Sequence, residues 1–127
     1  MEGKIKSFTD LNAWKEAHKL SIEIYKITKH FPKEEMFGLT SQMRRCAVSV
    51  VSNIAEGFSR ETYREKIRFY SISLGSLTEL QSQLLIAKDV SILDENIFKE
   101  LTPQIIKTHK ILNGLIRTSK NIQDSRF

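Results

Sequence analysis

The segment from Leu39 to Gly57 constrains the fold most, because its apolar residues recur every three or four positions. That spacing places them on one side of a helix, as in helices that pack against a protein core. The apolar positions are Leu39, Met43, Cys46, Ala47, Val50, Ile54 and Ala55. Gly57 tolerates the left-handed backbone conformation in which many helices end. The pattern therefore predicts a helix over residues 39–57.

Three further segments show the same helical spacing of apolar residues. Together with the first, they predict helices over about residues 10–29, 39–57, 62–89 and 94–120. Residues that can cap the first turns of the other three helices are Thr9 or Asp10, Thr62 and Asp94. The last helix is expected to fray after Lys120.

Two residues interrupt the regular pattern inside the expected helices. Pro103 removes a backbone donor and clashes with the preceding turn, so we expect a kink near Glu100 or a new start at Thr102. Gly75 costs about 1 kcal/mol of helix propensity relative to alanine. Because Gly75 lies among serines, the sequence predicts that a neighbouring helix approaches the third helix closely there.

Composition and chain length favour one all-helical domain. The 127 residues include two prolines and five glycines, too few for the many turns of a sandwich or barrel. A chain of this length suits a single domain with one core, spanning residues 1–127. Short segments join successive helices, which favours antiparallel neighbours. The predicted fold class is all-α, an antiparallel up-down-up-down four-helix bundle.

Cysteine usage and the lack of long apolar runs indicate the compartment. Cys46 is the only cysteine, so the chain cannot form an intrachain disulfide. Its place on the apolar side of a helix predicts a small buried residue rather than a catalytic thiol. No run approaches the roughly 20 apolar residues of a membrane span, and the first ten residues do not resemble a signal peptide. We expect a soluble, cytoplasmic protein.

The sequence contains few signs of catalysis or metal binding. His18, His30 and His109 fall on separate segments, and none has a second ligand at metal-binding spacing. A Gly-rich phosphate loop, a nucleophile elbow and an HExxH pair are absent from the sequence. We expect no enzymatic activity, no metal and no cofactor. A deep pocket in which Glu56, Glu79 and His109 converge would reopen the question.

A set of polar residues lies on the second and third expected helices. Its members are Arg44, Arg45, Asn53, Glu56 and Glu79. Polar residues between helices need partners, and Glu79 is a natural counter-charge for Arg44 or Arg45. A structural polar network is therefore favoured over an active site.

Basic residues give a stronger indication of function. The net charge of +5 favours polyanionic partners. Candidates for nucleic-acid contact lie in one run expected on the third helix and a second run along the last helix. They are Arg60, Arg64, Arg68, Lys99, Lys107, Lys110, Arg117 and Lys120. Few aromatic residues interleave with them, which favours binding to the phosphate backbone over stacking on bases. A solvated charged face is the alternative interpretation.

Four blocks of sequence resemble a known family. They are Phe31-Pro32 with Phe37-Gly38-Leu39, Gln42-Met43-Arg44-Arg45, Asn53-Ile54-Ala55-Glu56-Gly57, and Leu74-Gly75-Ser76-Leu77-Thr78-Glu79-Leu80. In order and spacing they resemble the bundle proteins encoded within intervening sequences of bacterial 23S ribosomal RNA genes, also named S23 ribosomal proteins. More distantly, they are similar to accessory variability proteins of diversity-generating retroelements. The resemblance implies a homopentamer whose motif residues define the bundle more than an active site.

Taken together, these features predict a non-enzymatic four-helix bundle that self-associates and presents basic surfaces to RNA or DNA. Such a protein could serve as an accessory factor in a ribonucleoprotein, as relatives in retroelements are associated with a reverse transcriptase and nucleic acid. The alternative is a protein-interaction scaffold whose basic faces only keep it soluble. The sequence does not distinguish RNA from DNA and does not name a protein partner.

Overall fold

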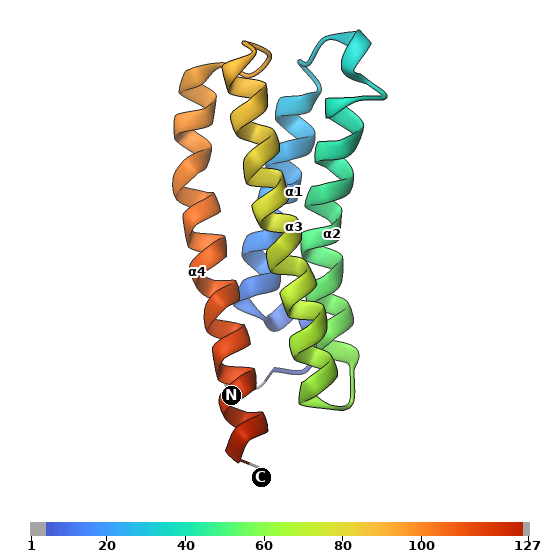
Figure 1. Ribbon diagram of the computed structural model, residues 1–127, viewed down its shortest axis with the longest axis vertical. Coiled ribbons are helices and arrows are strands. Elements are labelled where there is room, and N and C mark those ends of the chain that lie inside the picture. Colours follow the sequence, from blue (N-terminus) through green and yellow to red (C-terminus); the bar gives the residue numbers. More distant parts are fainter. Residues whose placement is uncertain (1–4, 126–127) are drawn as a thin grey trace.

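Four long helices run along one axis and form the whole framework of the molecule (Figure 1). The computed structural model describes residues 5–125. The helices are α1 (Asn12–Thr28), α2 (Leu39–Ser59), α3 (Tyr63–Asp89) and α4 (Glu95–Ser125), with short 3₁₀ turns at Phe8–Asp10 and Lys33–Glu35. Successive helices run in opposite directions, and no strand occurs within the described residues. The predicted all-α, antiparallel four-helix bundle is confirmed.

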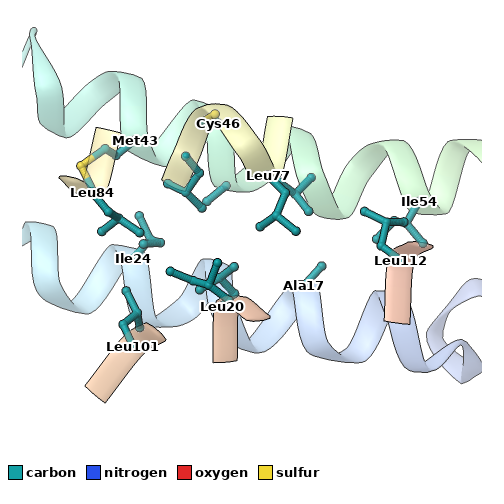
Figure 2. Close-up of a cluster of buried hydrophobic side chains, with 14 of the residues drawn as sticks. Ala17, Leu20, Ile24, Met43, Cys46, Ile54, Leu77, Leu84, Leu101 and Leu112 are labelled. Carbon is teal, nitrogen blue, oxygen red and sulfur yellow. The ribbon is translucent and has the colours of Figure 1, made fainter. Parts of the chain in front are cut away.

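All four helices contribute apolar side chains to one central cluster. Figure 2 shows side chains from the different helices pointing toward one another. They include Leu20 and Ile24 from α1, Met43 and Ile54 from α2, Leu77 and Leu84 from α3, and Leu101 and Leu112 from α4. Burying a side chain of this size stabilises the fold by about 1.5–3 kcal/mol relative to leaving it in water. The helical spacing read from the sequence therefore places the core on the correct side of each helix.

Side chains cap two of the helices as the sequence predicts. The Thr62 hydroxyl accepts a hydrogen bond from the Glu65 amide of α3 at 3.2 Å. The Asp94 carboxylate accepts one from the Asn96 amide of α4 at 2.8 Å. Each cap satisfies an amide that has no partner inside the helix. These two starts depend on neighbours in sequence, which explains why they could be predicted.

The start of α1 differs from the prediction of a cap at Thr9 or Asp10. Ser7 and Asp10 instead close the short 3₁₀ turn, where the Asp10 carboxylate accepts the Lys6 amide at 2.9 Å and the Ser7 amide at 3.1 Å. These backbone hydrogen bonds lower the pKa of Asp10. Helix α1 then begins after Leu11, which has extended backbone and no side-chain cap.

Gly57 does not end α2, because the helix continues to Ser59. The glycine is buried against Tyr70 of α3. A Cβ atom at this position would lie 2.6 Å from Cε1 and 2.8 Å from Cδ1 of the buried Tyr70 ring. The predicted stop is therefore wrong, and Gly57 instead provides room for Tyr70.

Gly75 shows the opposite situation. A Cβ atom there would have no neighbour within 4 Å, and the residue is exposed. The predicted close approach of a helix of the same bundle at Gly75 is wrong. The serines beside it face α2 instead: the Ser73 hydroxyl donates to the Val50 carbonyl at 2.6 Å, and the Ser76 hydroxyl lies 2.8 Å from the Ser49 hydroxyl.

Pro103 lies inside α4, which is one helix from Glu95 to Ser125. The predicted new start at Thr102 is wrong, and the helix also continues past Lys120. Pro103 and Lys99 are both exposed, so water can bond the Lys99 carbonyl that the proline leaves without an amide partner. The proline is therefore tolerated without a break in the helix.

Candidate nucleic-acid interface

Lys99, Lys110 and Arg117 lie along one side of α4. Their separations are close to whole numbers of helical turns, and Lys120 follows one turn later. From Lys99 to Arg117 the row extends about 27 Å at 1.5 Å per residue. All four side chains are exposed, and none has an acidic partner within 4.0 Å among residues 5–125. These cations are therefore available to an external anion.

Lys107 differs from the other candidates on α4. Its ammonium group lies 3.0 Å from the carboxylate of Glu16 on α1. The Glu16 carboxylate is largely buried and also lies 3.8 Å from Lys19. The charge of Lys107 is thus partly offset inside the bundle, which makes it a weaker contact for phosphate than its neighbours.

The arginine run that the sequence places on the third helix is divided in the structure. Arg60 follows the end of α2 and lies before α3 begins. Its guanidinium is 3.2 Å from the Glu56 carboxylate and lies over the Phe69 ring at 4.5 Å from the centroid. Arg68 lies over the same ring at 5.9 Å. Arg64 is exposed and, in the described part of the chain, has no ion-pair partner.

Phe69 is a residue of this surface that sequence reasoning missed. It provides an aromatic face for two guanidinium groups, so an aromatic residue does interleave with the cations here. Nearby, the Lys66 ammonium donates to the Phe58 carbonyl at 2.6 Å, and burial lowers the pKa of Lys66. The position of Phe69 next to Arg68 in the sequence could have suggested a contact with that arginine. The contact with Arg60 could not be predicted in this way, because it depends on the turn between α2 and α3.

Parts of the two basic runs lie at the same end of the bundle. Figure 1 shows that α3 begins at the end of the bundle where α4 finishes. Arg64 and Arg68 therefore lie at the same end as Arg117 and Lys120, whereas Lys99 lies toward the opposite end of α4. The candidates form a basic end with an extension along α4 rather than one compact patch.

The predicted polar network resolves into separate contacts. Arg44 joins α2 to α1: its Nε donates to the Thr28 hydroxyl at 2.8 Å, and its guanidinium lies 4.8 Å from the centroid of the Tyr25 ring. The Asn53 amide donates to the Ser49 carbonyl at 2.8 Å within α2. Glu56 pairs with Arg60, as described above. Glu79, the expected counter-charge for Arg44 or Arg45, forms no hydrogen bond or ion pair with Arg44.

Arg45 and Glu79 line a surface pocket of about 280 Å³ between α2 and α3. The other lining residues are Gln42, Cys46, Ser49 and Ser76. Over the described residues, Arg45 and Glu79 form no ion pair within 4.0 Å. Glu79 accepts a hydrogen bond from the Gln83 amide at 3.3 Å. The two opposite charges therefore share a pocket and remain open to an outside partner.

Residues with catalytic potential do not converge. The Cys46 thiol donates to the Ser76 carbonyl at 3.1 Å, and burial, with a smaller effect of Glu79, raises its pKa to about 11. His109 lies 2.9 Å from the Gln81 amide oxygen, and burial lowers its pKa. Glu56, Glu79 and His109 thus have different partners on different sides of the bundle. Within residues 5–125, no three His, Cys, Asp or Glu side chains are grouped to hold a metal ion.

Residues 9–114 match the family described as 23S rRNA-intervening sequence protein. The chain belongs to this family. The same fold occurs in a solved protein of unknown function from the S23 ribosomal protein family of Bacteroides thetaiotaomicron. The two structures agree with a TM-score of 0.76 at 17% sequence identity, over 83% of this chain and 95% of that chain. No curated protein matches the sequence.

The family match covers most of the helical framework. The matched region of this intervening-sequence protein covers α1, α2, α3 and most of α4. None of the helices within residues 5–125 has the length and apolar character needed to cross a membrane. The similarity to the Bacteroides protein establishes the shared four-helix fold.

Proposed function

We propose that this protein self-associates and binds structured RNA or DNA through its basic end and the exposed side of α4, as an accessory factor in a ribonucleoprotein. The observation that carries the proposal is the row of unpaired cations on α4. Lys99, Lys110 and Arg117 lie along one side of a rigid helix and have no acidic partner in the described chain. When such free cations contact phosphates, they displace the counterions that are condensed on the nucleic acid, and this release favours binding.

The form of the surface favours contact with the nucleic-acid backbone. Long, flexible lysine side chains suit phosphates, while the Arg60 and Arg68 guanidiniums are held against Phe69. Each guanidinium keeps donors for phosphate oxygens while its face rests on the ring. Nothing in this arrangement requires a particular base sequence, so we expect recognition of shape and charge.

The family description and the resemblance support the same proposal. The family is described by its link to 23S rRNA, and the solved relative carries the S23 ribosomal protein name with unknown function. The resemblance to retroelement accessory proteins adds an association with nucleic acid and implies a pentamer. Assembly would bring several copies of the basic surface together and strengthen polyanion binding through multivalency. The expected setting is the bacterial cytoplasm.

Binding of labelled structured RNA and duplex DNA over a series of salt concentrations tests the proposal. We expect affinity to fall steeply with salt for the wild-type protein. The double variant Lys110→Glu, Arg117→Glu should weaken binding at least tenfold and reduce the salt dependence. The matched control is Lys29→Glu, Lys33→Glu, which changes net charge equally near the opposite end of the bundle. Equal losses in both variants would contradict a specific basic surface.

The alternative is a protein-interaction scaffold without nucleic-acid binding. The pocket between α2 and α3 favours it, because that surface carries both signs of charge rather than a basic excess. Absence of binding to either nucleic acid at low salt would reject the nucleic-acid proposal and leave the scaffold. An enzymatic role has no support from the geometry described above.

A further inference from the structure

Helix α3 has apolar residues on two sides, unlike a helix that faces one core. Its inner side carries Tyr70, Leu77 and Leu84, which are buried. Its outer side carries Ile72 and Ile86, which are 44% and 51% exposed. Accordingly, α3 is the least amphipathic of the four helices. The bundle core accounts for the inner side only.

The exposed isoleucines of α3 belong to a regular row. Ile72, Glu79 and Ile86 follow one another at seven-residue spacing, which places them above one another along one side of the helix. Gly75 lies between the first two of them on the same side. This spacing is the one with which a helix packs against a second helix over several turns. We name the surface formed by Ile72, Gly75, Glu79 and Ile86 the outer α3 row.

No packing contact within the single chain explains why a glycine occupies position 75. A glycine inside a helix lowers stability by about 1 kcal/mol relative to alanine. At Gly57 the cost is offset by the close approach of Tyr70, but a Cβ at Gly75 would meet nothing within 4 Å. A glycine in the middle of an exposed row leaves a shallow place where a helix from outside can come close.

The charges beside the outer α3 row complement one another. Glu79 lies in the row, and Arg45 lies across the pocket on α2, yet the two do not pair. A polyanion would meet the Glu79 carboxylate and two isoleucines, so this surface does not suit nucleic acid. A protein surface with isoleucines and the opposite arrangement of charges does suit it. A second copy of this chain has both features at the same place.

We infer that the outer α3 row, with Arg45, is the surface through which copies of this chain associate. Arg45 of one copy pairs with Glu79 of the other, while isoleucines and Gly75 bring the helices together. A two-fold dimer and a closed ring both allow this pairing. The inference rests on the self-association in the proposed function and names the surface responsible for it.

Charge reversal with rescue, followed by light scattering, tests the pairing. Arg45→Glu and Glu79→Arg should each shift the mass of the wild-type assembly toward the 14.7 kDa of one chain. The double variant Arg45→Glu, Glu79→Arg restores opposite charges between copies and should recover the assembly. Assembly in both single variants, or failure of the double variant to recover it, would overturn the pairing. Circular dichroism confirms that each variant is folded.

Gly75→Leu provides a second test that does not depend on charge. A Cβ atom at this position meets nothing within 4 Å in the single chain, and leucine has a higher helix propensity than glycine, so circular dichroism should show the helices retained. The assembly should dissociate because leucine fills the place of closest approach. An unchanged mass would overturn the inference. As a control, Lys110→Glu, Arg117→Glu should lose nucleic-acid binding and keep its assembly.

Self-association and the surface assigned to it can be rejected separately. If the wild-type protein has the mass of one chain at micromolar concentration, then both the proposed self-association and this surface are rejected. If the wild type assembles and the Arg45, Glu79 and Gly75 variants assemble equally well, only this surface is rejected. Nucleic-acid binding is measured independently in each case.

Discussion

The α2–α3 contact and the α1–α4 contact are built from different kinds of residue. Between α2 and α3, Gly57 lies against Tyr70, and the Ser73 hydroxyl reaches the Val50 carbonyl. Between α1 and α4, the ion pair of Glu16 and Lys107 lies among open surface pockets of about 460 and 480 Å³. Small residues bring the first two helices together, whereas long charged side chains bridge the second two.

This difference shows how one bundle can combine a contact made by small residues with one bridged by long charged side chains. Close approach allows many dispersion contacts and excludes water, so a single added carbon atom is felt strongly. A bridge of long side chains keeps one end in water and tolerates change. We therefore expect substitutions at the α2–α3 contact to have larger effects than substitutions at the α1–α4 contact.

The largest effect is expected from Gly57→Ala. The new methyl group would lie within 3 Å of the buried Tyr70 ring, so the helices must move apart, and the free energy of unfolding should fall by about 2 kcal/mol. The matched control is Gly114→Ala on α4, where the added Cβ meets only Arg117 Nη2 at 3.9 Å. That variant should gain up to about 1 kcal/mol from helix propensity.

Urea denaturation at one fixed protein concentration measures both variants, because any assembly makes stability depend on concentration. The result that would contradict the comparison is an equal change of the same sign in the two glycine variants. Opposite signs would show that the close contact, and not the substitution itself, determines the outcome.

A smaller effect is expected from the titration of Cys46. Burial raises the pKa of its thiol to about 11, compared with 9.0 for the free group. Because the folded state holds the proton more tightly, this group contributes stability below pH 9 that is lost as pH rises toward 11. The contribution is at most about 2.7 kcal/mol, since one pKa unit corresponds to about 1.4 kcal/mol. Tyr70, whose pKa burial raises to about 12, acts in the same direction at higher pH.

The thiol contribution can be isolated with Cys46→Ala. The variant loses the same packing contacts at every pH, but it has no thiol to titrate. Because only the wild type loses stability as the thiol ionises, the difference between the two free energies of unfolding should narrow as pH rises from about 8 to about 10.5. Tyr70 is present in both proteins and cancels in the comparison. A difference that stays constant with pH would mean that water reaches the thiol and that the α2–α3 contact is looser than described.

The same comparison shows which features could be read from the sequence. The four helices, the core side of each and the Thr62 and Asp94 caps depend on residues a few positions apart, and these were predicted correctly. Gly57 and Gly75 are chemically identical and both lie inside helices, yet one contacts Tyr70 and the other faces open space. Their roles depend on the neighbouring helix, which local spacing does not specify.

The candidate site was harder to predict for the same reason. The partner of Arg44 is Thr28 on α1, and that contact depends on how α1 and α2 are rotated about their axes. Arg60 was placed on the third helix because its four-residue spacing to Arg64 is helical, but the turn after α2 separates them. The exposed positions on α4 needed only the period of one helix, and the structure shows them exposed.

The smallest effect is expected at the α1–α4 contact. A double-mutant cycle with Glu16→Gln and Lys107→Met isolates the energy of this ion pair from other effects of each substitution. The carboxylate is largely buried, but the lysine side chain is 61% exposed, so solvent screens the attraction. We expect a coupling energy of about 0.5–1 kcal/mol that decreases further in about 0.5 M salt.

Glu16 also lies 3.8 Å from Lys19, which retains part of the attraction in the Lys107 variant and lowers the measured coupling. A coupling above about 2 kcal/mol that persists at high salt would mean that water is excluded from this contact too. The α1–α4 contact would then be as rigid as the α2–α3 contact, although it uses charged rather than small residues.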